Sequence, residues 1–238
     1  MVKLVVFDVD GTLVKSVKVD TLCFVQSIKD LFVIKNIDTR WHTYKTATDS
    51  GIFEEIFKKT YSRKPKASEV HRHIERFTKL LREQYLIDKN LFKEVPGSRR
   101  ILAKLKAHPT WKVAIATGGW RKSTILKLAF ANIDFNGLPF VTASDEKTRE
   151  DIMRRCINIS KTQYALSHFD KIVSVGDSTW DIKTAHNLKI GFVGLNEPSV
   201  FAGVKGCLST QDYNDSDVFM NLLENATIPD LEGATWTR

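Results

Sequence analysis

The sequence predicts an α/β protein in which a doubly wound, Rossmann-like parallel sheet carries an inserted all-helical domain. Short apolar runs at residues 3–7, 113–116, 172–175 and 191–195 have the pattern of strands that are buried on both faces. Stretches of helical periodicity separate the later runs, as expected where helices connect parallel strands. Residues 17–92 show helical periodicity and no comparable apolar run, which indicates a helical insertion.

The length and composition are sufficient for a substantial core. Of the 238 residues, 42% are apolar, and the 36 Lys and Arg exceed the 28 Asp and Glu by 8. The basic residues are dispersed among acidic ones, without a long basic run. This charge pattern favours a small anionic substrate as the partner and argues against nucleic acid.

Neither a targeting segment nor a membrane span is expected. The first apolar run meets polar residues within ten positions, which is too short for a signal peptide, and no run approaches membrane-spanning length. We therefore expect a cytoplasmic protein. Cys23, Cys156 and Cys207 form no paired motif and are predicted to be buried thiols. The six histidines have no zinc-ligand spacing.

The first strand, residues 3–7, ends at the sequence Asp-Val-Asp-Gly. Side chains alternate along an extended chain, so the carboxylates of Asp8 and Asp10 can reach the same space. Two close carboxylates repel each other unless a cation or a proton separates them. Mg²⁺ prefers oxygen ligands, and a carboxylate beside it can attack phosphorus. The end of this strand is therefore the predicted magnesium and catalytic site.

The insertion shows apolar residues three or four positions apart, as on one face of a helix. They are Leu22, Val25, Ile28 and Leu31 in one stretch and Val70, Ile74, Phe77 and Leu81 in another. A further helix begins near Ile52. Asp49 or Ser50 is predicted first of all to cap its N-terminus, with a contact to substrate as the alternative.

Domain boundaries follow from where the strands resume. Pro96-Gly97-Ser98 starts a helix that leads back to the second strand, so the chain returns to the sheet near residue 95. After Asn225 no period is sustained. The predicted organisation is an α/β catalytic core of residues 1–16 and 93–226, a helical cap of residues 17–92, and a loosely ordered tail of residues 227–238.

A second polar segment follows the strand at residues 113–116. Thr117, Gly118 and Gly119 place a hydroxyl group and flexible backbone between a strand and a helix, where backbone amides can hold phosphate oxygens. The alternative is a tight strand-to-helix connection without a ligand. Trp120 comes next. We predict that its side chain packs against neighbouring structure, and contact with substrate is the alternative that we rank second.

A third polar segment follows the strand at residues 172–175. Gly176 permits a turn, and Asp177 is the natural additional metal ligand. Asp181 lies four residues later at a loop-to-helix junction, where Asp is also a preferred N-cap residue. Trp180, like Trp120, is predicted to pack. Because ligands bind beyond the carboxyl ends of parallel strands, the three segments are expected to converge on one site.

The ordered trio of segments resembles the haloacid dehalogenase (HAD) superfamily. The resemblance rests on D-x-D-G-T-L at residues 8–13, a strand-terminal Thr117, and G-D-x-x-x-D at residues 176–181, and it spans the chain except for the tail. It implies a phosphatase that uses Mg²⁺ and has a helical cap between the first two motifs. The expected substrate is a small phosphorylated metabolite.

The resemblance also implies roles for the residues of the first two motifs. Asp8 is the nucleophile and a metal ligand. Asp10 is the general acid toward the leaving group and then the general base toward water, and its backbone carbonyl is a metal ligand. Thr117 and Gly118 contact the phosphate group.

For the rest of the site, the resemblance assigns metal binding to Asp177 and support of the metal-bound shell to Asp181. The family also uses a basic residue, usually Lys, ahead of the last motif. Here Lys147 and Arg149 are the candidates, in place of the common Lys-Pro pattern. We prefer Arg149, because its planar fork can hold phosphate oxygens bidentately, and we keep Lys147 as the second choice.

Three other functions stay open at this point. A sugar phosphomutase shares the carboxylate pair and the cap and returns the phosphoryl group to the substrate. A 2-haloacid dehalogenase shares the fold, but such relatives have no acid two residues after the nucleophile, so Asp10 favours phosphoryl chemistry. An inactive binding or regulatory module is the alternative of another class, and the presence of all the core carboxylates argues against it. No sequence feature specifies the oligomeric state.

Overall fold

The computed structural model describes residues 1–232 and residue 234. Its centre is a parallel sheet with the strand order β3-β2-β1-β4-β5-β6. The strands are β1 (Lys3–Phe7), β2 (Trp111–Ala116), β3 (Phe140–Val141), β4 (Lys171–Gly176), β5 (Gly191–Leu195) and β6 (Leu208–Thr210). The strand order reverses between β1 and β4, and in such sheets this is where ligands bind. The predicted parallel α/β fold is confirmed.

The sequence pattern misses the edge strands and shortens two central strands, β2 and β4. β3 has two residues and β6 has three, too few for an apolar period to stand out. Each edge strand is defined by its neighbour, as in the pairing of Phe140 with Ile115. β2 begins at Trp111 and not at Val113, because the polar Lys112 interrupts the apolar run but still lies in register with Leu4.

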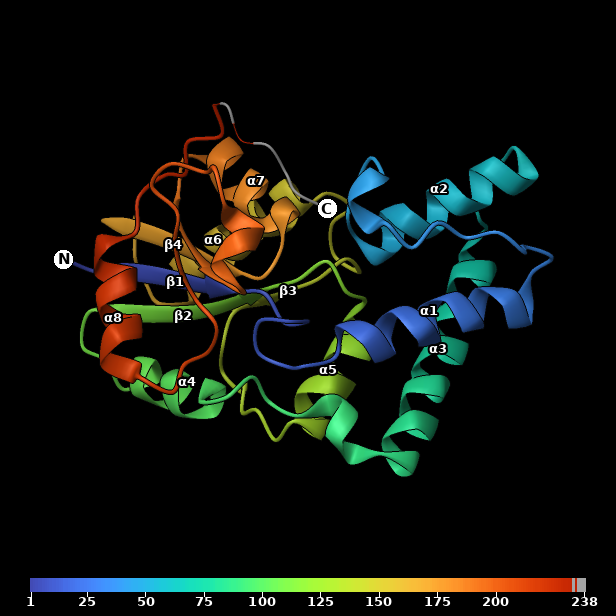
Figure 1. The fold of residues 1–238 in the computed structure, drawn as a ribbon, viewed down its shortest axis with the longest axis horizontal. Helices are drawn as coiled ribbons and strands as arrows, with labels where there is room; N and C mark the ends of the chain where they lie inside the picture. Colours follow the sequence, from blue (N-terminus) through green and yellow to red (C-terminus); the bar gives the residue numbers. More distant parts are fainter. Residues whose placement is uncertain (233, 235–238) are drawn as a thin grey trace.

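Helices cover both faces of the sheet (Figure 1). One face carries α4 (Ser98–Lys106), α5 (Arg121–Phe130) and α8 (Ser216–Asn225), and the other carries α6 (Arg149–Gln163) and α7 (Thr179–Leu188). The side chains of β1 alternate between these layers. Val5 and Phe7 face the first layer, and Leu4 and Val6 face the second. A strand buried in this way on both faces explains the continuous apolar run of its sequence.

The insertion is helical, as predicted. It contains α1 (Val17–Leu31), η1 (Trp41–Thr43), α2 (Asp49–Tyr61), α3 (Ala67–Ile87) and η2 (Lys89–Phe92). Within residues 17–92, all of which the structure describes, there is no strand. The helices lie together beyond the carboxyl ends of β1 and β2 (Figure 1). We call them the cap and keep residues 17–92 as its proposed bounds.

The end of the chain contacts the core as far as the structure describes it. The backbone amide of Phe192 donates to the carbonyl of Thr227, and Asp230 pairs with Lys205 in an isolated bridge. Part of the tail that was predicted to be loosely ordered, residues 233 and 235–238, lies outside the described residues. In the described part of the chain, no helix is both long and apolar enough to cross a bilayer.

The three cysteines are free thiols. Cys23 and Cys156 are buried, as expected, whereas Cys207 is only half-buried. Burial raises the pKa of the Cys23 and Cys156 thiols to about 12. Both therefore stay protonated at neutral pH and serve as apolar packing groups.

His73 gives the cap an expected sensitivity to acid. Its ring is fully buried, stacks on Phe53 with 4.4 Å between centroids, and has Nδ1 2.9 Å from Ser27 Oγ. Burial lowers the pKa of His73 from 6.5 to about 3. As the pH falls, the unfolded state therefore binds the proton first. The corresponding stability is present above about pH 6.5 and is lost on acidification.

We expect acidification from about pH 7 to about pH 4.5 to lower the free energy of unfolding by about 3 kcal/mol through His73. Urea unfolding at the two pH values measures this. The variant His73→Phe should lose that part of the acid dependence, while His71→Gln, at an exposed position of the same helix, should retain it. An equal acid dependence in His73→Phe and the parent chain would contradict the assignment.

Candidate active site

The first motif places Asp8 directly after β1, in a turn that requires glycine. Asp8 is buried, and its backbone amide donates to the carbonyl of Val175 on β4. Gly11 has φ +78°, which favours glycine. A Cβ atom on Gly11 would lie 2.1 Å from Oδ2 of Asp177. The glycine thus lets the first and third motifs approach each other closely.

Three buried carboxylates form a group that fits a divalent cation. Ligand oxygens of Asp8, Asp177 and Asp181 all lie within 4.8 Å of one another. The cationic group nearest to them is the guanidinium of Arg149, whose Nη1 is 3.4 Å from Asp8 Oδ1 and 3.1 Å from Asp181 Oδ1. Three carboxylates against one guanidinium leave an excess of negative charge. An all-oxygen donor set with that excess suits Mg²⁺.

Burial and the excess of negative charge raise the pKa values of these carboxylates. Burial, followed by the Asp8 charge, raises the pKa of Asp177 from 3.8 to about 7. Burial and the Asp8 charge also raise the pKa of Asp181 well above its usual range. The pKa of Asp8 is raised by burial against the opposing effect of Arg149 and the Thr117 hydroxyl. A bound cation would favour the ionised carboxylates.

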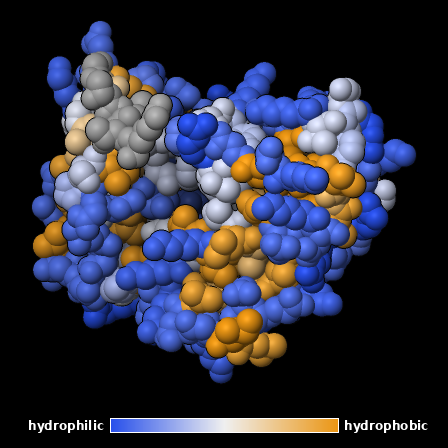
Figure 2. All heavy atoms as spheres, turned by 45° about the vertical axis from the view of Figure 1, so that its right-hand side comes forward, coloured by the Kyte–Doolittle hydropathy of each residue, from blue (hydrophilic) through white to orange (hydrophobic). Residues whose placement is uncertain are grey.

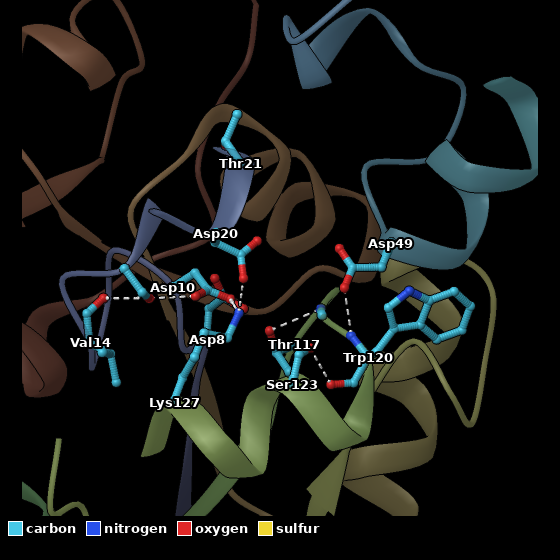
Figure 3. Close-up of polar contacts among 12 residues, drawn as sticks. Asp8, Asp10, Val14, Asp20, Thr21, Asp49, Thr117, Trp120, Ser123 and Lys127 are labelled. Carbon is cyan, nitrogen blue, oxygen red and sulfur yellow. Dashed lines mark hydrogen bonds and ion pairs between the residues drawn. The ribbon is translucent and has the colours of Figure 1, made fainter. Parts of the chain in front are cut away.

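Asp10 is held apart from this group by two side chains. Its Oδ1 accepts a hydrogen bond of 2.5 Å from Ser16 Oγ, and its Oδ2 lies 2.5 Å from Nζ of Lys127. Lys127 comes from α5, is fully buried, and also pairs with Asp20 of α1 at 2.5 Å (Figure 3). Both oxygens of Asp10 therefore have a fixed partner, and its carboxylate is oriented before any substrate binds.

Lys127 is the main residue that the sequence analysis missed. It lies on the buried side of α5 together with Ser123, Thr124 and Leu128. A lysine on the inward face of an amphipathic helix is rare unless it is paired, so this position was the available signal. Its partners Asp10 and Asp20 are 117 and 107 positions away, and no local pattern identifies them.

The cap contributes Asp49 to the same space. The N-cap of α2 is Thr48, whose Oγ1 accepts from the amide of Gly51 at 3.1 Å, and not Asp49 or Ser50 as predicted. Asp49 instead accepts a hydrogen bond of 2.7 Å from the backbone amide of Trp120 (Figure 3). Burial, opposed by Lys127, raises the pKa of Asp49 to about 6.

The second motif lies at the carboxyl end of β2, beside Asp8 and in contact with the cap. Thr117 is 2% exposed at the end of β2, next to Asp8. Gly118 passes so close to Arg149 that a Cβ atom on it would lie 2.6 Å from Cζ. The carbonyl of Gly118 accepts from the amide of Asp49 at 2.8 Å. This backbone hydrogen bond, together with the bond from the Trp120 amide to the Asp49 side chain, joins the cap to the second motif.

The structure brings Arg149 and not Lys147 into the site. Arg149 is the first residue of α6, and its Nε donates to the carbonyl of Ala47 at 2.7 Å while its Nη1 faces Asp8. Lys147 is exposed and pairs with Glu54 on the cap at 2.5 Å. Although Lys147 and Arg149 are only two positions apart, Lys147 lies at the surface and Arg149 lies in the site.

The third motif ends in a capping box. Ser178 is the N-cap of α7, and Asp181 is its third residue, accepting from the amide of Ser178 at 3.2 Å. Asp181 thus contributes to the helix start without being the N-cap residue itself. Trp180 lines the site with its ring beneath Arg149, 5.6 Å from Cζ, whereas Trp120 is 5% exposed and packs in the core.

The site opens into a pocket between the core and the cap. It encloses about 650 Å³ of empty space, including its mouth. Figure 2 shows the surface hollowed where these two parts meet. The lining combines the three motifs with Arg149 and with cap residues; these are Asp8, Asp10, Thr117, Gly118, Gly119, Asp177, Ser178 and Trp180 of the core, and Val17, Asp20, Thr21, Phe24, Trp41, Ala47, Thr48, Asp49 and Ile52 of the cap.

Comparisons with known proteins agree with this architecture. The family model for haloacid dehalogenase-like hydrolases matches residues 5–195. No curated protein sequence matches the chain. Among solved structures, it is similar to a HAD hydrolase of family IA, variant 3, from Entamoeba histolytica HM-1:IMSS, with a TM-score of 0.65 and 15% identity over 93% of this chain and 99% of that one.

Two other solved structures carry more descriptive names. A predicted phosphoglycolate phosphatase from Haemophilus somnus 129pt has a TM-score of 0.58 and 19% identity, covering 92% of this chain and 98% of that one. A mutant of CbbY from Rhodobacter sphaeroides, in complex with xylulose-(1,5)bisphosphate, has a TM-score of 0.64 and 16% identity, covering 90% and 96%. At these identities the likeness concerns the fold.

Proposed function

The chain belongs to the haloacid dehalogenase-like hydrolase family, and from this premise we propose that it hydrolyses small phosphate monoesters with Mg²⁺ as its cofactor. One observation carries the proposal. A buried carboxylate, Asp8, ends β1 inside an acidic group, while a second carboxylate, Asp10, is oriented separately by Ser16 and Lys127. Two neighbouring carboxylates with different partners suit a nucleophile and a proton carrier.

The chemistry proceeds in two steps. An oxygen of Asp8 attacks phosphorus, the bond from phosphorus to the leaving oxygen breaks, and Asp10 gives its proton to that oxygen. A water molecule then gives a proton to Asp10 and attacks the phosphorus of the aspartyl-phosphate. This releases inorganic phosphate and restores the Asp8 carboxylate. Asp10 acts first as acid and then as base, so no other proton carrier is needed.

Side chains of the core would hold the phosphoryl group during these steps. The Thr117 hydroxyl and the Gly118 backbone border Asp8, and Arg149 supplies a guanidinium that is already fixed by Ala47 and Asp181. A preorganised cation stabilises developing charge without the cost of reorganisation. Asp8, Asp177 and the backbone carbonyl of Asp10 would bind Mg²⁺, with support from Asp181. The ion would neutralise charge on the phosphate oxygens.

The cap forms one side of the pocket. α1 provides Asp20 and Phe24, and α2 provides Asp49 and Ile52, all of which line the pocket. Asp49 and Lys147 link the cap to the core by polar contacts near the pocket, and these contacts would help to hold the cap closed. A closed cap excludes bulk water and protects the phosphorylated Asp8 from side reactions.

The test is release of inorganic phosphate from p-nitrophenyl phosphate and a panel of alkyl phosphates. We expect turnover at millimolar Mg²⁺, a loss of at least about 100-fold in EDTA, and recovery when Mg²⁺ is restored. Ca²⁺ should support much less turnover, because it prefers more ligands and longer distances. Turnover that EDTA does not affect would contradict a magnesium enzyme. Formation of an isomeric phosphate without free phosphate would identify a phosphomutase.

A further inference from the structure

The part of the pocket beyond Asp10 decides which leaving groups fit. If Asp10 protonates the leaving oxygen, as the proposed function requires, the rest of the leaving group has to lie against the wall next to Asp10. The cap forms that wall. It consists of Val17, Asp20, Thr21 and Phe24 of α1, Trp41 of η1, and Asp49 and Ile52 of α2.

This wall is acidic and offers no free cation. Among the described residues that line the pocket, Arg149 is the only basic one, and it is engaged by Asp8, Asp181 and Ala47 at the phosphate end. Lys127 does not line the pocket, and its ammonium group pairs with Asp10 and Asp20. Asp10, Asp20 and Asp49 therefore face one ammonium group.

The two cap carboxylates also present unused oxygens. One oxygen of Asp20 contacts Lys127 and one oxygen of Asp49 accepts from Trp120. The other oxygens point toward each other across the space beside Asp10 (Figure 3). Burial, with a further contribution from the Asp10 charge, raises the pKa of Asp20 to about 8 and that of Asp49 to about 6, although Lys127 opposes both shifts. A cation placed between these oxygens would favour the ionised form of both carboxyl groups, whereas a second anion there would oppose it.

The remainder of the wall is apolar. Phe24 and Trp41 meet edge to face, with 5.7 Å between ring centroids, and Trp41 Nε1 donates to Thr21 Oγ1 at 3.1 Å. Ile52 is 6% exposed and lies in the same lining. Such a surface favours a carbon skeleton over a second charged group.

Basic side chains near the site border a different cavity. His42, Lys45 and Lys183 line a hollow that shares Arg149 and Trp180 with the main pocket. Its lining includes none of Asp10, Asp20 and Asp49. These bases therefore border a hollow other than the one that contains Asp10, Asp20 and Asp49.

We propose that the substrate is a phosphate monoester whose leaving group carries an ammonium or hydroxyl donor on a carbon skeleton and no second anionic group. The donor lies between Asp20 and Asp49, and the carbon atoms lie against Phe24, Trp41 and Ile52. An added carboxylate or phosphate would face the acidic side chains of Asp20 and Asp49, and the one basic residue of the described lining, Arg149, is already engaged. Asp20 and Asp49 are thus specificity determinants, and this inference rests on the proposed phosphatase activity.

Three two-carbon phosphate esters test the charge preference at nearly constant size. They are 2-aminoethyl phosphate, 2-hydroxyethyl phosphate and 2-phosphoglycolate, whose far ends are cationic, neutral and anionic. We expect kcat/KM to decrease in this order, with the cationic ester exceeding the anionic one by about 10- to 100-fold. Where turnover is slow, the inhibition constant of each ester against p-nitrophenyl phosphate gives the same ranking.

Two variants test whether the cap residues Asp49 and Thr21 set the preference for cationic over anionic esters. Asp49→Asn removes a charge but keeps an oxygen for the Trp120 amide, and it should narrow the ratio between cationic and anionic esters at least about 5-fold. Thr21→Arg adds a cation to the wall and should raise kcat/KM for 2-phosphoglycolate. Asp134→Asn, an exposed carboxylate paired with Lys106, is the matched control and should leave the ratio unchanged.

The outcomes separate the two proposals. Mg²⁺-dependent hydrolysis of p-nitrophenyl phosphate together with a preference for 2-phosphoglycolate would overturn the substrate class and leave the phosphatase assignment standing. A ratio that neither Asp49→Asn nor Thr21→Arg changes would also overturn the role of the wall. No phosphate release from any ester, in a protein whose circular dichroism shows it folded, would overturn both.

Discussion

Replacement of Asp8 by Asn should lower kcat for phosphate-ester hydrolysis by roughly 10⁴- to 10⁶-fold, as is typical when a nucleophile is removed. An amide oxygen does not attack phosphorus and cannot carry the phosphoryl group. KM should change much less, because Arg149, Thr117 and Gly118 still border the phosphate site. The measurement is steady-state phosphate release at saturating Mg²⁺.

The same variant should remain folded. Asp8 is buried beside Asp177 and Asp181, so the substitution removes one of three neighbouring carboxylates. In EDTA the melting temperature of Asp8→Asn should therefore equal or exceed that of the parent chain. Asp134→Asn, made at an exposed position, controls for the change of residue type. Undiminished turnover in Asp8→Asn would exclude Asp8 as the nucleophile.

Replacement of Lys127 by Met should lower the free energy of unfolding by about 3–5 kcal/mol. Lys127 is fully buried, and its removal leaves the carboxylates of Asp10 and Asp20 without their cation. Burial alone would lower the pKa of Lys127, but Asp10, Asp20 and Asp49 raise it above its usual range. The amine therefore stays charged across the accessible pH range.

Lys127→Met should also reduce catalysis through Asp10. Because one oxygen of Asp10 loses its partner, we expect kcat to fall at least about 10-fold while KM changes less. The pH profile of kcat should shift, which a purely structural role of Lys127 would not cause. Positioning, and not contact with substrate, is the role that these readouts test.

Controls for Lys127 come from the same helix and from its partner. Lys122→Met, at an exposed position of α5 that pairs with Glu75, should cost less than about 1 kcal/mol. Adding Asp20→Asn to Lys127→Met should recover about 1–3 kcal/mol, because one unpaired buried charge is removed. If Lys127→Met were as stable and as active as Lys122→Met, the ion pairs of Lys127 with Asp10 and Asp20 would contribute neither to stability nor to catalysis.

The sequence pattern was most informative where local structure and topology coincide. The apolar run of β1 ends at Asp8 and that of β4 ends near Asp177, and in a parallel sheet both ends meet at one edge. The α/β fold and the convergence of the three motifs follow from this alone. Edge strands were missed because their pairing, and not their own sequence, makes them strands.

The N-terminus of α2 differs from the prediction by one position. The region of α2 was predicted to be helical with Asp49 or Ser50 as its N-cap, but Thr48 is the N-cap, and Asp49 lines the pocket instead. Asp and Thr are both good caps, and sequence pattern does not rank neighbours. A difference of one position thus separates a structural residue from a proposed specificity determinant.

The sequence by itself determined the carboxylate pair at the end of the first strand, the polar residues after the other two strands, and the helical insertion, because periodicity and turn residues are local properties of the chain. Only the tertiary structure decided that Lys127 pairs with both Asp10 and Asp20 and that Arg149, not Lys147, faces Asp8. These contacts join residues more than a hundred positions apart. Their geometry depends on which face each helix turns toward the sheet, and no short pattern specifies that.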